Sequence, residues 1–364
     1  RATIDTGKDG TAREHVNRTT PFVDLNQTYG SHASHHAFMR EYEVVDGKPV
    51  PTGRMLDGAD GGLPTWKDVK DQARTVLGFE FDDADVLDVP LLATDPYGHL
   101  LLSAGGNAQL ATKDGLVEGN RAAPVATNGL TANASFLDDI AHGATPKPDT
   151  TTDGVVIPGY DNDALDAHYV AGDGRANENI GLTAVHHVFH SEHNRLQAQI
   201  EAELADMPAE LQARFAADGF WDEGERSFQA ARYLAEMQYQ HLVFEEFARR
   251  IQPEIDPVVL NENSYQPDVN SSIRAEFAHS VYRFGHSMLR ETIPVQQADG
   301  TMKDVKLLDA FLKPTLFAES GTNADDAAGN ILKGLANQTA NGVDEFVTDT
   351  LRNQLLGLPL DLAT

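Results

Sequence analysis

The chain has 364 residues, of which 41% are hydrophobic, so it can bury one large core or two medium ones. Acidic residues outnumber basic ones by 56 to 28, and the resulting net charge of −28 disfavours nucleic acids and anionic membranes as partners. The absence of cysteine excludes disulfides, thiolate catalysis, haem–thiolate ligation and iron–sulfur clusters. We find neither a signal peptide nor an apolar run long enough for a transmembrane helix.

The first part of the chain, residues 1–174, predicts an irregular and loop-rich structure. Its first 60 residues are polar and rich in glycine, and a short helix is expected over 64–78, after a proline. Beyond residue 79, Asp, Gly, Pro, Asn and Thr punctuate short apolar pieces, which indicates few regular elements. The stretch TPKPDTTTDG (145–154) predicts a surface loop or linker.

The second part, residues 175–364, predicts helices, because its apolar residues recur at close to helical spacing. Long helices are expected over 182–204, 222–251 and 272–289, and shorter ones over VKLLDAFLK, ADDAAGNILKGLAN and VDEFVTDTLRNQLL. Strand signals are weak and short. The fold class is therefore mainly α, with long irregular loops and little β, and the two parts fit a single domain over 1–364.

One early segment, TPFVDLN, carries oxygen-bearing groups on alternate residues. They are the Thr20 hydroxyl, the Phe22 carbonyl, and the side chains of Asp24 and Asn26. Calcium prefers six to eight hard oxygen ligands drawn from side chains and carbonyls. A calcium loop and a metal-free loop rich in Asp and Asn both fit this segment.

A second segment, LTAVHHVFHSEHNRL, places three histidines on one face of a predicted helix. His186, His190 and His193 follow at spacings of four and three residues, which suits zinc or non-haem iron. The H-E-x-x-H pattern of zinc proteases is absent. Solvated histidines, or an internal polar network through EHNR, explain the same residues.

A third segment, VYRFGHSMLR, sets Arg283 and His286 three residues apart in apolar surroundings. A neutral imidazole on a helix, beside a glycine that leaves room for a flat macrocycle, suits an axial haem ligand. A buried histidine satisfied by a neighbour is the simpler interpretation, and the segment alone does not decide between them.

Taken together, five segments resemble, in the same order, the animal-type haem peroxidases of the peroxidase–cyclooxygenase superfamily. The resemblance is anchored from about residue 20 to residue 350 and implies the animal haem peroxidase fold. The matching segments are TPFVDLNQTYGS, RANE with LTAVHHVFHSEHNRL, WDEGERSFQAAR, YRFGHSML and LANQTANGVDEF.

The resemblance also implies site roles. His286 is similar to the proximal iron ligand, and Asn337 to the asparagine that accepts a hydrogen bond from its other ring nitrogen. Arg283 matches an arginine beside a haem propionate, and Arg175 matches the distal arginine. Glu178 matches the glutamate that forms an ester with the haem. The implied cofactors are haem b, with Glu178 as its covalent attachment, and Ca²⁺ held by Thr20, Phe22, Asp24 and Asn26.

Two departures from the family pattern stand out. The D-H-D or D-H-G segment that carries the distal histidine is not found in residues 1–19, and the [NR]-x-x-R-x-R-D-x-G segment is not found after the last helix. We therefore expect a central fragment whose distal histidine comes from a missing segment or another chain. Asn179 replaces the methionine of myeloperoxidase, and the lack of cysteine indicates the bacterial, secreted branch.

The function implied by the resemblance is that of a haem peroxidase, which reduces hydrogen peroxide and oxidises a small donor. The donor is an organic compound, a halide or Mn(II), and the protein is expected outside the cell or on its surface, beside flanking segments of a larger protein. The alternative is a catalytically vestigial, calcium-stabilised module of a large secreted adhesion or structural protein. A further rival is a non-haem metalloprotein that uses the three histidines.

Overall fold

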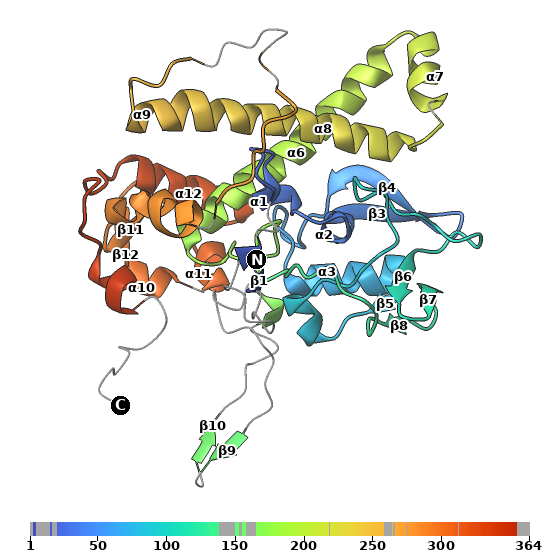
Figure 1. The fold of residues 1–364 in the computed structure, drawn as a ribbon, viewed down its shortest axis with the longest axis horizontal. Helices are drawn as coiled ribbons and strands as arrows, with labels where there is room; N and C mark the ends of the chain where they lie inside the picture. Colours follow the sequence, from blue (N-terminus) through green and yellow to red (C-terminus); the bar gives the residue numbers. More distant parts are fainter. Residues whose placement is uncertain are drawn as a thin grey trace.

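The computed structural model describes residues 20–137, 165–217, 219–257, 264, 266–274, 276–311 and 313–354, and the backbone alone of residues 3–4, 15–16, 150–152 and 155–157. Figure 1 shows the long helix α6 (Ile180–Asp206) in the middle of the molecule, with α8 (Glu223–His241) across it. The N-terminal elements lie on one side of α6 and the C-terminal elements on the other (Figure 1). None of the described helices is long and apolar enough to cross a membrane.

Helices dominate the described residues, as the sequence predicts. The other α-helices are α1 (Asn26–Tyr29), α2 (Ala33–Phe38), α3 (Trp66–Gln72), α7 (Ala209–Ala217), α9 (Arg249–Ile251), α10 (Leu307–Ala310), α11 (Pro314–Ala318) and α12 (Ala324–Ala336). Turns of π-helix cover Ala73–Leu77, Leu242–Ala248, Phe277–Val281 and Thr350–Gln354, and turns of 3-10 helix cover Asp83–Leu87 and Tyr282–Met288.

The strands form small two-stranded sheets. The antiparallel pairs are β1 (Thr3–Ile4) with β2 (His15–Val16), β3 (Arg40–Val45) with β4 (Lys48–Met55), β6 (Gln109–Thr112) with β7 (Gly115–Glu118), β9 (Thr150–Thr152) with β10 (Val155–Ile157) and β11 (Thr292–Gln296) with β12 (Met302–Lys306). A parallel pair joins β5 (Phe79–Glu80) to β8 (Val125–Ala126). The mainly α fold class with little β is confirmed.

Helix α6 links two hydrophobic cores. Its first turns place Ile180 and Ala184 in the core of the C-terminal elements, while Phe189 and Leu196 lie in the core of the N-terminal elements. The helix begins where the Asn179 side chain accepts a hydrogen bond from the backbone N–H of Leu182, which satisfies one of its free donors. Because Ile180 is buried in the core of the C-terminal elements, the turn just before residue 180 is anchored beside that core.

Helix α8 is attached to the N-terminal part through the segment WDEGERSFQAAR. Asp222 caps the helix by accepting a hydrogen bond from the Glu225 N–H at 2.8 Å, and Trp221 Nε1 donates to Asp95 at 2.9 Å. The Glu225 carboxylate is fully buried and pairs with Arg40 of β3, which is also buried. This segment therefore has a structural role, since its polar groups are used to join α8 to β3.

Three predicted elements differ from the structure. The helix expected over 272–289 is described as helical only from residue 276, and changes from π to 3-10 geometry at residue 282. The segment VDEFVTDTLRNQLL contains only the turn Thr350–Gln354, and residues 355–356 lie outside the described residues. The first two residues of VKLLDAFLK, Val305 and Lys306, belong to strand β12 and are not helical. Most of the predicted loop 145–154 also lies outside the described residues.

Candidate functional site

The turn that precedes α6 fixes the predicted distal arginine. The Asp173 carboxylate accepts hydrogen bonds from the Arg175 backbone N–H at 2.9 Å, from Nε at 3.1 Å and from Nη2 at 2.9 Å. The Glu178 N–H donates to the Arg175 carbonyl at 2.8 Å, which closes the turn. Burial favours the protonated form of Asp173, but the ion pair with Arg175 outweighs it and lowers the pKa of Asp173 to about 2.

Glu178 lies where the two halves of the predicted site meet. Burial raises the pKa of this half-buried carboxyl, while the charges of Arg175, His286 and Arg283 act in the opposite direction. Charges act on a pKa in this way only over short distances. Arg283 and His286 therefore lie close enough to Glu178 for their charges to act on its carboxyl, although they come from a segment far away in the sequence.

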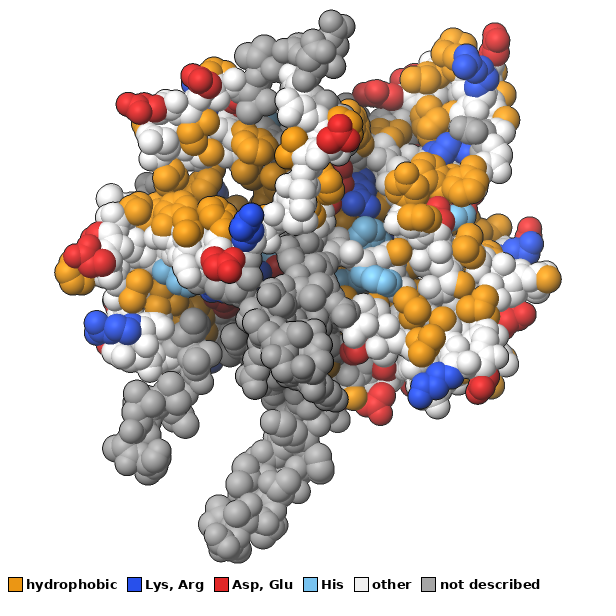
Figure 2. Space-filling model, in the orientation of Figure 1, with side chains coloured by type: hydrophobic (Ala, Val, Ile, Leu, Met, Phe, Trp, Pro, Cys, Tyr) orange, Lys and Arg blue, Asp and Glu red, His pale blue; other side chains and the backbone are white. Residues whose placement is uncertain are grey.

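The segment that carries His286 has an open side. Both Arg283 and His286 are exposed on the 3-10 turn Tyr282–Met288, and a side-chain carbon added at Gly285 would meet no atom within 4 Å. Val281 and Tyr282 are 62% and 67% exposed, and Figure 2 shows hydrophobic side chains gathered on the surface below α9. Exposed apolar side chains close in sequence to an imidazole suit a flat, apolar ligand.

These groups fit a haem. The imidazole of His286 can supply an axial nitrogen, Arg283 can pair with a propionate, and the half-buried carboxyl of Glu178 is available for a covalent link. Within the described part of the chain, no hydrogen bond occupies the ring nitrogens of His286. His286 therefore has a ring nitrogen available to bind a haem iron from one side.

Asn337 ends α12, and its side-chain N–H donates to the Lys333 carbonyl at 2.8 Å. No hydrogen bond between Asn337 and His286 is found among the described residues. Asn341 contacts the histidine segment instead, since its amide donates to the Leu289 carbonyl at 2.7 Å. The sequence interpretation missed Asn341, although the following glycine marks a turn that could have drawn attention to it.

The expected calcium loop contains an unsatisfied acidic oxygen. Oδ1 of Asp24 is buried and has no hydrogen-bond partner among the described residues. Burial raises the pKa of Asp24, while a hydrogen bond from Thr20 and the charge of Arg232 oppose the rise. The Phe22 N–H donates to Thr20 Oγ1 at 3.3 Å, and Asn26 begins α1. A buried carboxylate oxygen without a partner fits a bound cation.

Each of these three histidines of α6 has a hydrogen-bond partner of its own. His190 Nε2 lies 2.9 Å from Asp57 Oδ1, and His193 Nδ1 lies 2.8 Å from the Tyr29 hydroxyl. His186 is buried and hydrogen bonded to the backbone of α1. Among the described residues, no three His, Asp or Glu side chains are grouped to hold a metal. The internal polar network explains these histidines better than a shared metal does.

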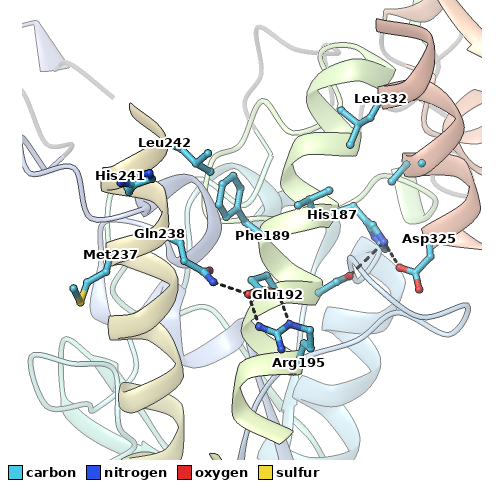
Figure 3. Close-up of a pocket in the computed structure, with 14 residues that line it drawn as sticks. His187, Phe189, Glu192, Arg195, Met237, Gln238, His241, Leu242, Asp325 and Leu332 are labelled. Carbon is cyan, nitrogen blue, oxygen red and sulfur yellow. Dashed lines mark hydrogen bonds and ion pairs between the residues drawn. The ribbon is translucent and has the colours of Figure 1, made fainter. Parts of the chain in front are cut away.

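A cavity of about 980 Å³ lies apart from these residues, between α6, α8 and α12. Figure 3 shows its hydrophobic wall, with Phe189, Leu242 and Leu332, and a polar end where Arg195 is bonded to Glu192. Arg175, Glu178, Arg283 and His286 are not among the residues that line it. The cavity is therefore separate from the predicted site.

Comparisons with known proteins identify the family of this chain. A family profile described as "Animal haem peroxidase" matches residues 139–364. The chain is 27% identical over 203 residues to "Peroxidasin homolog pxn-2" of Caenorhabditis elegans, which covers 54% of this chain and 14% of that protein. It is 28% identical over 222 residues to "Peroxinectin A" of Dictyostelium discoideum, which covers 57% of this chain and 36% of that protein.

A solved structure shares the fold. "Peroxidase A from Dictyostelium discoideum" superposes with a TM-score of 0.55 at 20% sequence identity, over 99% of this chain and 50% of that chain. The chain therefore spans about half of this structure, and a smaller share of the two relatives. The profile covers more than half of the 364 residues. The chain belongs to the animal haem peroxidase family.

Proposed function

We propose that this chain carries the haem-binding part of a peroxidase that reduces hydrogen peroxide and oxidises a small electron donor. The observation that supports this best is that the charges of Arg175, Arg283 and His286 all act on the half-buried Glu178 carboxyl. A bound haem b would supply the redox chemistry, taking electrons from the donor and passing them to peroxide. The residues of this chain would hold the haem and stabilise charge.

Each residue then has a distinct task. His286 would bind the iron through one ring nitrogen, and Arg283 would pair with a propionate. Glu178 would provide the covalent link. The Arg175 guanidinium would stabilise the negative charge that develops as the peroxide O–O bond breaks. Asn337 would accept a hydrogen bond from His286 through its side-chain oxygen, since its present bond to the Lys333 carbonyl uses only the amide nitrogen.

The calcium ion and the donor belong to the same proposal. Asp24, Thr20, the Phe22 carbonyl and Asn26 would hold Ca²⁺, and the unpartnered Asp24 oxygen supports this. The net charge of −28 attracts cations and repels halides, so Mn(II) or a neutral organic donor is favoured over chloride. We place the protein outside the cell, in the bacterial branch, because a chain without cysteine that is stabilised by calcium suits export.

The alternative is a vestigial module that keeps the fold but lacks activity. The exposure of His286 is the observation that favours it. Such a module would use the calcium loop for stability and would tolerate the loss of Arg175.

Comparison of two arginine variants tests the activity. We expect Arg175→Ala in the haem-loaded protein to lower the rate of peroxide consumption about 100-fold or more, the usual effect of removing a charge-stabilising donor. Arg195→Ala is the matched control, because Arg195 is also exposed and also makes two bonds to a carboxylate, Glu192. Equal rates for the two variants, or no peroxide consumption by the haem-loaded parent, would favour the vestigial module.

A further inference from the structure

We propose that Asp173 is a positioning residue, which holds the Arg175 guanidinium at a fixed place and orientation on the turn that carries Glu178. This inference rests on the proposed function of Arg175. Its structural part, the control of Arg175 by Asp173, can be measured without haem, so the two ideas can fail separately.

The contacts of Asp173 restrain Arg175 at both its backbone and its side chain. One carboxylate oxygen accepts from the Arg175 backbone N–H at 2.9 Å and from Nε at 3.1 Å, and the other accepts from Nη2 at 2.9 Å. A two-point bond between carboxylate and guanidinium sets the plane of the guanidinium as well as its distance. The Arg175 side chain is 49% exposed, so these bonds to Asp173 restrict the rotamers that it adopts.

Asp173 is in turn held against α1. Its backbone N–H donates to the Gln27 carbonyl at 3.2 Å. The neighbouring Gly172 has no room for a side chain, because an added carbon would lie 2.1 Å from the Gly30 nitrogen and 2.3 Å from the Asn26 carbonyl oxygen. The turn therefore lies directly on the segment that follows the candidate calcium loop, and the position of Asp173 is fixed by backbone contacts.

The charges around Asp173 agree with this role. The groups that interact electrostatically with Asp173 are Arg175, Glu178 and the buried imidazoles of His35 and His186. Burial lowers the pKa of His35 to about 4 and also lowers that of His186, so both rings are neutral near pH 7. Arg175 is then the cation that Asp173 faces, and the ion pair remains intact over the range in which a peroxidase is assayed.

A series at one position separates the contributions. Asp173→Glu keeps the charge, and Asp173→Asn keeps an oxygen for the Arg175 backbone N–H but loses the charge. Asp173→Ala loses both. Glu192→Gln is the control, because Glu192 also makes a two-point bond to an exposed arginine, Arg195 of α6.

The first measurement follows the Arg175 Nε–H signal by NMR on the full chain without haem, assigned with Arg175→Lys. We expect slow hydrogen exchange at this signal in the parent and in Glu192→Gln, and at least tenfold faster exchange in Asp173→Asn. Unchanged exchange in Asp173→Asn would overturn the proposal, whatever the haem-loaded protein does.

The second measurement is the rate constant for the reaction of the haem-loaded chain with hydrogen peroxide. Because misplacing a catalytic group by about 1 Å can cost about 100-fold, we expect a loss of about 10- to 100-fold in Asp173→Asn, with substantial recovery in Asp173→Glu. If Asp173 only neutralised Arg175, Asp173→Asn would react faster, and that result would overturn the proposal. Should Asp173→Ala fail to fold, Asp173→Asn still decides, since it keeps the backbone bond.

Discussion

The buried ion pair between Arg40 and Glu225 links β3 to α8. The side chains of both residues are almost completely buried, with exposures of 1% and 0%. The Arg40 guanidinium lies 4.0 Å from the centre of the Phe228 ring, and its Nη2 donates to the Tyr97 carbonyl at 2.6 Å. Replacing Glu225 by Gln leaves the arginine charge in this site without its counter-ion.

The size of the effect follows from the loss of one partner. Removing one member of a buried pair typically costs about 3–5 kcal/mol, because the remaining charge is neither solvated nor paired. The Tyr97 carbonyl and the Phe228 ring offset part of that cost, so we expect a loss of about 3 kcal/mol for Glu225→Gln. Replacing both residues, as in Arg40→Met with Glu225→Leu, should recover most of the stability, because no buried charge remains.

Urea unfolding followed by circular dichroism measures the free energy of unfolding of these variants. Glu192→Gln is the control, because the Arg195–Glu192 pair is exposed and such pairs contribute at most about 1 kcal/mol. A loss below about 1 kcal/mol for Glu225→Gln, or a double variant less stable than the single one, would refute the reasoning.

Two further results are expected. The free energy of unfolding should fall from pH 7 to pH 5, because burial lowers the pKa of His36 and His193 to about 3 in the folded protein. In the unfolded chain these two histidines bind protons below about pH 6.5, so acid favours unfolding. Each contributes about 2 kcal/mol over this range, so His36→Gln should flatten the profile, and an unchanged profile would contradict the assignment. Millimolar Ca²⁺ should raise the melting temperature of the parent by several degrees and leave Asp24→Asn unaffected, with the exposed Asp114→Asn as control. Equal shifts in Asp24→Asn and the parent would exclude Asp24 as a calcium ligand.

The long helices could be predicted from the sequence because their signals are local. The apolar spacing of α6 and α8 extends over many residues, and the caps Asn179 and Asp222 stand directly before them. The predicted helix 272–289 has the same kind of spacing, yet Phe277, Val281 and Tyr282 are largely exposed in the structure. Periodicity alone does not supply a partner surface, and tertiary packing decides how regular such a helix becomes.

The site was predicted less completely, since spacing along the chain does not say which distant segments meet. Only the family resemblance placed Arg175 and Glu178 near Arg283 and His286. It did not give the partner of Asn337, which is set by the end of α12, or the role of Asp173. The partners of His190 and His193, Asp57 and Tyr29, come from more than 100 residues away, and so the histidines of α6 remained ambiguous until the fold was known.

Haem binding to the full chain tests the central claim most directly. The chain would be titrated with haemin and followed by its Soret absorbance, in parallel with His286→Ala and with His241→Ala, which removes a histidine that lines the separate cavity. We expect a stoichiometric complex with the Soret and ligand-field bands of a histidine-bound haem in the parent and in His241→Ala, and loss of these bands in His286→Ala. A His286→Ala protein with the same affinity and the same spectrum as the parent would contradict the account.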